Sequence, residues 1–336
     1  MTVADPAVDG PATPGLPARI LASPWTRFAA WRLGRLLVSL WVLVTAAFLM
    51  IHLIPGDPVR GALGLTAPQA LVERTREALG LNDPLWTQYL DYLHGLLTGQ
   101  LGVSMQSKLP VSSIIAQRLP PTLELAVLAF LVAVAVAVPL GVTMGVLTRR
   151  GRRRRTELGF TATSVVLGTV PDIIIGVVLV YVFAVQLDLV PVAGRSGPTS
   201  YLLPVIALSL GPAVILARIV RVEMVAVLEA DFIRTARAKR LPAPVIHLGH
   251  ALPNALTASL TLAGLLLSSL VAATVLVENV FAWPGLGGTI VSSIVNKDYP
   301  VAQAIVLVYG AFVLLVNLGV DVLLAILDPR SMIRQD

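Results

Sequence analysis

The chain has 336 residues, of which 56% are hydrophobic and 13% are charged, and its formal net charge is +6. Soluble domains usually have about 25% charged residues, so this composition excludes an ordinary soluble enzyme and is typical of a chain that lies largely in lipid. Cysteine is absent, which excludes disulfides, thiolate metal sites and cysteine chemistry.

The chain opens with residues 1–30, which we expect to form a disordered cytoplasmic tail because its first part is rich in Pro, Ala and Gly. No cleaved signal peptide is expected. Six apolar stretches then follow that reach or approach the roughly 20 residues needed to cross a bilayer. They are Leu36–Ile54, Leu125–Thr148, Leu158–Gln186, Tyr201–Ala217, Ala251–Val277 and Tyr299–Leu324. Helices are the expected form, because lipid offers backbone groups no other partner.

The first span, within residues 31–54, is followed by residues 55–121, a segment too long for a simple connector. Within it, Ala67–Leu79 has good helix formers, and Trp86–Leu93 has apolar residues at helical spacing. We therefore expect a small extracytoplasmic helical insertion between the first and second spans. Residues 122–328 should hold the other five spans, and residues 329–336 a cytoplasmic tail.

Arginine and lysine gather on one side of these spans, in the N-terminal flank, the loop Arg149–Arg155, the connection Arg218–Arg240 and the C-terminus. Such clusters fix orientation before they suggest nucleic acid, which is not an expected partner. Both termini are predicted to be cytoplasmic, so the predicted fold class is an all-α polytopic protein of a bacterial inner membrane. Prolines inside spans, such as Pro171, should kink their helices, either as tolerated irregularity or to shape a translocation path.

The cytoplasmic connection at residues 229–255 is the most informative segment. Its first part is the run Asp231, Phe232, Ile233, Arg234, Thr235, Ala236, Arg237, Ala238, Lys239 and Arg240. Asp231 is expected to cap a helix that Leu241-Pro242 ends. A helix this short is not stable alone in water. Its small residues suit a groove on a partner, although an ordinary basic loop that happens to be helical fits the same residues.

No catalytic constellation stands out. His247 and His250 lack the glutamate of an H-E-x-x-H motif, so no metal site is expected. The chain also lacks a G-x-x-x-x-G-K-[ST] phosphate loop. We therefore expect that it is not an enzyme by itself and that it binds neither ATP nor another cofactor.

Several motifs now form a recognisable series. They are Pro55–Pro58, Leu79–Leu81, Gly99–Ser104, Arg118–Leu125, Ile233–Lys239, His250–Ala255, Glu278–Phe281, Pro284–Gly287 and Leu327–Arg330. In their order and spacing they resemble the permeases of ABC importers, and more narrowly the first permease of the dipeptide and oligopeptide (Dpp/Opp) family. The resemblance covers roughly residues 32–330.

The resemblance implies a permease that forms half of a pore with a homologous second permease. Two cytoplasmic ATPase subunits, or one fused pair, would bind ATP and Mg²⁺, and an extracytoplasmic binding protein would deliver a peptide. Asp231–Arg240 would be the coupling helix in an ATPase groove, so a bulky charged residue at Ala236 should uncouple transport from hydrolysis. The family usually has Gly where this chain has Arg240, so the resemblance does not decide at which residue that helix ends. Nickel chelates and glutathione-like peptides are alternative substrates in the same family.

Polar residues within or beside the spans are the candidates for the translocation path, because charges in lipid are costly. A Gly/Pro-broken segment after the fifth span is predicted to help form an outer gate, with an ordinary outer loop as the alternative; its residues are Glu278, Asn279, Phe281, Pro284, Gly285 and Gly287. Asp172, Asn317 and Asp321 are candidate polar residues of the pore. So few charges fit poorly with a proton-coupled secondary carrier, the alternative of a different class. A membrane-anchored binding or sensory protein is a third interpretation.

Overall fold

The computed structural model describes residues 24–53, 58–64, 66–78 and 80–327. The expected tail at residues 329–336 lies outside these residues, as does the expected N-terminal tail apart from its last residues, which belong to the first helix. Parts of three family motifs, at residues 55–57, 79 and 328–330, also lie outside them.

Helices make up almost all of the described chain. The long ones are α2 (Pro24–Leu53), α6 (Val111–Thr148), α7 (Arg154–Thr169), α9 (Leu202–Glu229), α11 (Leu252–Val280) and α13 (Tyr299–Leu327). The short ones are α3 (Pro58–Leu63), α4 (Gln69–Ala78), α5 (Leu85–Leu97), α8 (Asp172–Leu179), α10 (Asp231–Ala238) and α12 (Leu286–Val295). Four 3-10 or π-helical turns complete the set: η1 (Arg149–Gly151), η2 (Val180–Gln186), η3 (Pro198–Tyr201) and η4 (Val245–Ala251). Among the described residues, five helices are long and apolar enough to span a membrane, and a bent pair makes a sixth if it counts as one span. The predicted all-α polytopic fold is confirmed.

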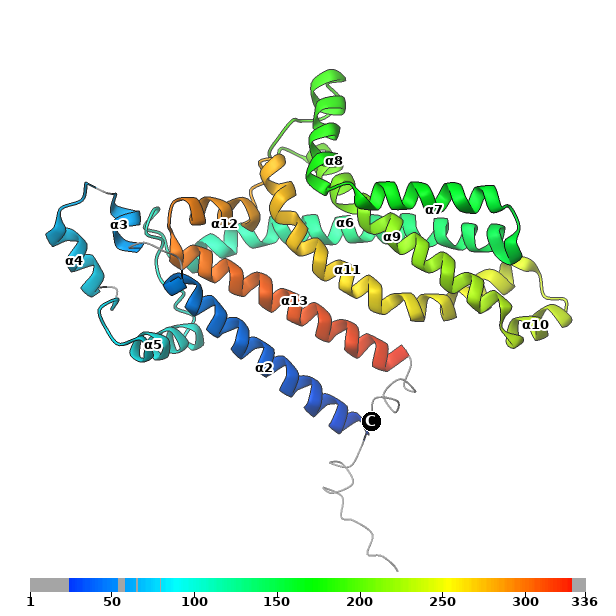
Figure 1. Ribbon diagram of the computed structural model, residues 1–336, viewed down its shortest axis with the longest axis horizontal. Coiled ribbons are helices and arrows are strands. Elements are labelled where there is room, and N and C mark those ends of the chain that lie inside the picture. The colour runs from blue at the N-terminus through cyan, green and yellow to red at the C-terminus, as the bar shows by residue number, and fades with distance from the viewer. Residues whose placement is uncertain (1–23, 54–57, 65, 79, 328–336) are drawn as a thin grey trace, which may run out of the picture.

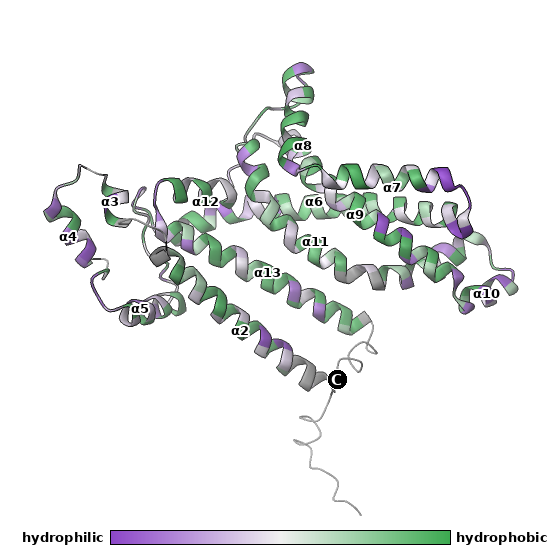
Figure 2. Ribbon diagram, in the orientation of Figure 1, coloured by the Kyte–Doolittle hydropathy of each residue, from purple (hydrophilic) through white to green (hydrophobic). Residues whose placement is uncertain are grey.

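The spans form two adjoining groups. Helices α6, α7, α9 and α11 run beside one another, and α2 pairs with α13 along their flank (Figure 1). Helices α3, α4 and α5 gather at one end of the molecule, and α10 lies at the opposite end (Figure 1). Hydrophilic residues concentrate near these two ends, notably on α4 and beside α10, whereas the spans between them are mostly hydrophobic (Figure 2).

The most extensive helix pairing is that of α6 with α9. The buried face of α6 includes a run of small residues, Ala129, Ala133, Ala137, Gly141 and Gly145. An added Cβ at Gly141 would lie 2.6 Å from the carbonyl oxygen of Ala217, and one at Gly145 would lie 2.8 Å from Cβ of Met224. Small residues allow two helix backbones to approach closely within a membrane. The α6–α9 pair is therefore a tightly packed seam through the whole bundle.

The second span differs from its prediction, because α6 begins at Val111 rather than Leu125 and continues through Pro120 and Pro121. Residues 111–121, which the sequence assigned to the outer segment, are thus the first turns of this helix. Val111 and Ile115 are buried in a cluster with residues of α12 and α13. Burial of this apolar face offsets the hydrogen bonds that the two prolines remove.

The third span is not the single helix predicted over Leu158–Gln186. It is divided into α7 and α8, with a bend of 90° at the break. Val170 has an extended conformation directly before Pro171. A proline disfavours the helical conformation of the preceding residue and donates no hydrogen bond, so the helix ends there. The expected kink at Pro171 is therefore a complete change of direction, whereas α6 and α9 continue through Pro139 and Pro212.

The outer insertion packs on the end of α2. The hydroxyls of Thr45 on α2 and Tyr89 on α5 lie 2.8 Å apart, and the rings of Phe48 and Tyr89 meet edge to face at 5.1 Å. After α5, the amide of Met105 donates to Asp298 Oδ1 at 2.9 Å, which joins the insertion to the start of α13. Helices α4 and α5 fall where the sequence predicted helix, whereas α3 was not anticipated.

Candidate coupling helix and outer junction

Helix α10 starts immediately after α9. Ala230 is extended, which lets the chain turn, and Asp231 is the first helical residue rather than the cap that the sequence predicted. No side chain caps this helix; the Asp231 carboxylate instead accepts from Arg234 Nη1 at 2.9 Å. A negative charge in the first turn still stabilises the helix through its dipole.

The two faces of α10 differ in their surroundings. Ile233 and Ala236 point inward, with 0% and 8% of their surface exposed, and pack in a cluster with α9 and η4. Phe232 is 47% exposed on the outward face. Arg234, Thr235, Ala238 and Lys239 share that exposed surface. A bulky charged residue at Ala236 would therefore disrupt the chain's own packing, and the uncoupling expected from such a residue stays a prediction.

The helix ends at Ala238, before the predicted limit at Arg240, because the chain turns there into a left-handed residue. Arg240 has φ of 57°, its amide donates to the Arg237 carbonyl at 2.9 Å, and the Leu241 amide donates to the Ala236 carbonyl at 3.3 Å. These two bonds are those of a Schellman motif, in which glycine is the usual left-handed residue. A glycine, which the resemblance leads one to expect here, would suit this left-handed position, and arginine fills the position without changing the motif.

Replacing Arg240 with glycine should stabilise the loop by about 1 kcal/mol, because glycine adopts a left-handed conformation without the steric cost of a Cβ. The measurement is the rate of limited proteolysis between α10 and η4 in detergent, which should fall. Arg240→Ala removes the charge but keeps the Cβ, and should not slow cleavage. Equal slowing in both variants would assign the effect to the lost charge.

The cytoplasmic end is strongly basic. Arg149, Arg150 and Arg152 gather there with Arg237. Burial, followed by Arg149 and Arg237, lowers the pKa of His247, which favours its neutral form. Arg221 Nη2 lies 2.6 Å from Glu157 Oε1, and Arg221 Nε donates to Thr148 Oγ1 at 2.9 Å. These contacts fix the start of α7 and the end of α6 to α9, so α10 lies beside a firmly held basic surface.

At the opposite end, a buried carboxylate organises the predicted gate segment. Glu278 is 1% exposed, and its Oε2 accepts from the amide of Gly287 at 2.6 Å. The neighbouring Leu286 amide donates to Thr122 Oγ1 of α6 at 2.8 Å. Both amides belong to the first turn of α12, which has no partner within its own helix for them. Glu278 and Thr122 therefore cap α12 from α11 and α6.

Glycine is required at two positions of this junction. A Cβ at Gly287 would lie 2.5 Å from Cα of Val275, and a Cβ at Gly285 would overlap the Glu278 carboxyl group. Trp283 is buried and donates its indole N–H to the Pro121 carbonyl at 3.1 Å.

The other predicted gate residues are placed as follows. Phe281 is buried against Gly176 of α8, and Pro284 is half-buried. Asn279 is exposed and donates to the Val275 carbonyl at 2.7 Å. The segment is thus folded onto α6, α8 and α11, and its role as a gate stays a prediction.

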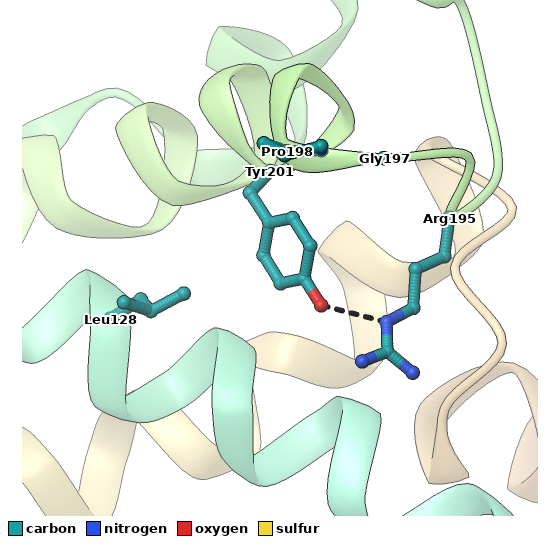
Figure 3. A pocket seen from close by; sticks show the side chains of 5 residues that line it. All are labelled: Leu128, Arg195, Gly197, Pro198 and Tyr201. Atoms are coloured by element: carbon teal, nitrogen blue, oxygen red, sulfur yellow. Dashed lines mark hydrogen bonds between the residues drawn. The ribbon is translucent and has the colours of Figure 1, made fainter.

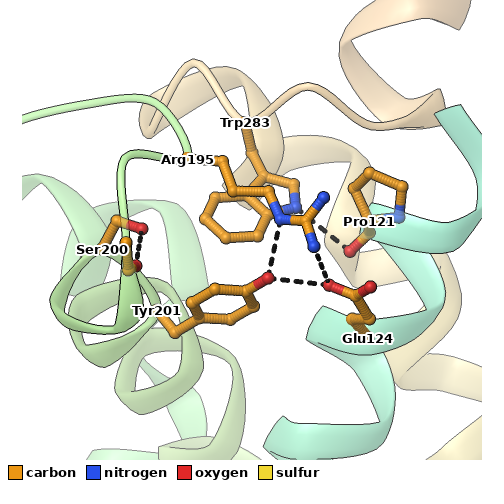
Figure 4. A network of polar contacts seen from close by, with 7 residues as sticks. Pro121, Glu124, Arg195, Ser200, Tyr201 and Trp283 are labelled. Carbon is orange, nitrogen blue, oxygen red and sulfur yellow. Dashed lines mark hydrogen bonds and ion pairs between the residues drawn. The ribbon is translucent and has the colours of Figure 1, made fainter. Parts of the chain in front are cut away.

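Sequence reasoning missed a polar network next to this junction. Arg195 Nη2 lies 2.7 Å from Glu124 Oε2, Arg195 Nε donates to the Tyr201 hydroxyl at 2.7 Å, and that hydroxyl donates to Glu124 at 2.7 Å (Figure 4). Tyr201 also meets Trp283 edge to face at 4.7 Å. The three polar side chains join α6, the outer loop and the start of α9. The sequence held no signal for this pairing, because Glu124 and Arg195 are 71 positions apart.

An open pocket of about 610 Å³ adjoins the network and is lined by Leu128, Arg195, Gly197, Pro198 and Tyr201 (Figure 3). Its polar groups are those of the network, and its remaining wall is apolar.

Two of the three candidate pore residues have partners inside the chain. Asp321 pairs with Arg32 of α2 at 2.5 Å, and Asn317 Oδ1 accepts from Ser268 Oγ of α11 at 3.1 Å. Asp172 begins α8 and lies against Gly211 of α9. In the described residues no group of three or more metal-ligating side chains occurs. A pore role for the three stays a prediction.

A bundle of apolar spans with a short basic helix at one end defines the class as a multi-pass membrane protein. Family comparison gives the particular assignment: residues 137–333 match the binding-protein-dependent transport system inner membrane component family, and residues 25–126 match its N-terminal part. The chain belongs to this family. It is the permease component of an ABC importer and a multi-pass protein of the bacterial inner membrane.

Relatives of known name agree with this assignment. The chain is 38% identical over 298 residues to the glutathione transport system permease protein GsiC of Pectobacterium atrosepticum, covering 89% of this chain and 96% of the relative. It is 36% identical over 299 residues to GsiC of Escherichia coli K12, with the same coverage. An inward-facing structure of the MetNI methionine ABC transporter matches with a TM-score of 0.52 at 19% identity, covering 64% of this chain and 96% of that one. This last likeness concerns the fold alone.

Proposed function

We propose that this permease imports peptides as half of a heterodimeric pore. Its partners are a homologous second permease, two cytoplasmic ATPase subunits or one fused pair, and an extracytoplasmic binding protein that delivers the substrate. The chain is not an enzyme by itself and binds no cofactor, since ATP and Mg²⁺ bind in the ATPase subunits. The observation that carries the substrate class is the identity of 38% with GsiC across nearly the whole length of both chains.

The outward face of α10 supports the coupling step. Phe232 is an exposed aromatic residue beside Arg234 and Lys239, and exposed apolar residues within a polar rim are typical of protein interfaces. The inward face holds the helix against α9, so a movement of the docked ATPase passes to the spans as a rigid-body shift.

Within this class, two substrates are favoured. Di- and oligopeptides are the general substrates of the Dpp/Opp family, and a glutathione-like tripeptide is favoured by the names of the relatives. Nickel chelates are the remaining alternative in the same family.

The test is co-purification followed by transport. The tagged chain is extracted in detergent, and co-purifying proteins are identified. A sister permease and P-loop ATPases are expected, and the reconstituted complex should take up labelled di- or tripeptide when its binding protein and ATP are supplied. Competition between unlabelled glutathione and a dipeptide then separates the two substrates. Peptide uptake by the chain alone, driven by a proton gradient without ATP, would overturn the proposal in favour of a secondary carrier.

A further inference from the structure

A second pocket lies between α2, α11 and α13, away from the outer junction. Its volume is about 340 Å³. One wall is apolar and includes Leu36, Leu262, Leu265 and Leu314, whereas its polar side chains are those of Arg32, Arg35, Ser39, Asn317 and Asp321. Helices α2 and α13 are adjacent, and the start of α2 lies near the end of α13 (Figure 1). The pocket is therefore amphipathic, and its charged residues, Arg32, Arg35 and Asp321, lie toward the cytoplasmic end of these helices.

The charges of these three residues do not cancel. Arg32 is paired with Asp321 at 2.5 Å. Arg35 is exposed, its guanidinium lies 5.8 Å from the centre of the Trp31 ring, and no carboxylate of a described residue pairs with it. The three side chains thus leave one net positive charge, on Arg35, directly beside an apolar cavity.

The depth of Arg35 in the membrane indicates which group its charge can reach. Helix α2 has 30 residues and a length of about 45 Å, which exceeds the hydrocarbon core of about 30 Å. Counting roughly 20 residues back from the outer end at Leu53 places Arg35 at the inner edge of the hydrocarbon. Phospholipid phosphates lie at this level, and a guanidinium here is stabilised when it reaches one of them.

We propose that this pocket binds one anionic phospholipid of the cytoplasmic leaflet. The phosphodiester lies against the Arg35 guanidinium, whose planar donors suit bidentate contact with phosphate oxygens. One acyl chain follows the leucine wall of α11 and α13. Asp321 neutralises Arg32, so the single positive charge that remains matches the single negative charge of a phosphatidylglycerol headgroup. Basic pockets between spans on the cytoplasmic side are suited to such lipids.

The experiment is native mass spectrometry of the purified protein, together with any subunits that co-purify, after titration with phosphatidylglycerol or phosphatidylcholine. Phosphatidylglycerol should be retained as one tightly held molecule per chain, and Arg35→Gln should reduce its retention about fivefold to tenfold. Arg35→Lys should restore part of it. Arg152→Gln removes the same charge from an exposed cytoplasmic turn and should leave retention unchanged.

Two further measurements separate the possible outcomes. Leu314→Trp narrows the apolar wall without touching any charge, so it should also reduce lipid retention, whereas added inorganic phosphate should not displace the lipid. Displacement of the lipid by inorganic phosphate would show that the pocket binds anions in general and would overturn the proposal of a lipid site. Equal retention of the two lipids, or equal losses in the Arg35 and Arg152 variants, would overturn the proposal. All variants should first elute as a single monodisperse peak; if Arg35→Gln does not, Leu314→Trp decides the outcome.

Discussion

Replacing Phe232 with aspartate should abolish ATP-dependent uptake while the permease stays folded. Phe232 is the exposed aromatic residue of the outward face of α10. Aromatic anchors at interfaces commonly contribute at least about 2 kcal/mol, so its loss should weaken binding of the ATPase by about 30-fold. The measurement is the affinity of the purified ATPase for the permease in nanodiscs, with uptake in proteoliposomes as the second readout.

Ile233→Asp provides the matched comparison, because the two positions are adjacent but face opposite ways. Ile233 is fully buried against the chain's own core, so a charge there should loosen the loop and make it sensitive to protease. Phe232→Asp should leave the loop resistant to protease and lose only the ATPase. Normal ATPase affinity in the Phe232 variant would show that α10 does not dock through this face.

Gly287→Ala should destabilise the outer junction by about 1 to 3 kcal/mol, because the new methyl group would lie 2.5 Å from a backbone atom of Val275. The junction cannot yield easily, since the same turn is tied to Glu278 and Thr122 through two backbone amides. The expected results are a lower thermal transition and an increase in chemical labelling of cysteines introduced between positions 279 and 289.

The adjacent Gly288 offers a close control. A Cβ there would have its nearest neighbour, the Trp283 carbonyl oxygen, at 3.9 Å. Alanine also favours helix over glycine by about 1 kcal/mol, so Gly288→Ala should be neutral or slightly stabilising. If both substitutions had the same effect, the close packing of Gly287 would not be the reason that glycine is needed there.

The sequence predicted the spans well because hydropathy acts locally. It could not predict that α6 begins at Val111, because that depends on burial against α12 and α13, whose residues are far along the chain. It predicted a change at Pro171 but not its size, which depends on how α8 packs on α9 and α11.

The candidate sites were predicted only in part, because local patterns do not show how residues far apart in the chain pack together. The sequence placed a helix at Asp231–Arg240, yet it could not say that Ala236 faces inward, because only packing on α9 and η4 decides this. It singled out Glu278 as a residue of the predicted outer gate, but not its burial or its hydrogen bond to the Gly287 amide, because helix α12 was not predicted. The Arg195 network joins residues too distant in the chain for any local pattern to connect.

The close packing of small residues between α6 and α9 makes the two helices one rigid unit that crosses the membrane. At its cytoplasmic end α9 leads directly into α10, and at its outer end α6 holds Trp283 and Leu286 through Pro121 and Thr122. Helix α6 has 38 residues and a length of about 57 Å, so a tilt of about 5° about one end would move the other by about 5 Å. A small rotation of the helices at the cytoplasmic end, caused by a docked ATPase, would thus displace their outer end by about one helical turn. No flexible loop lies between the two ends to absorb this movement.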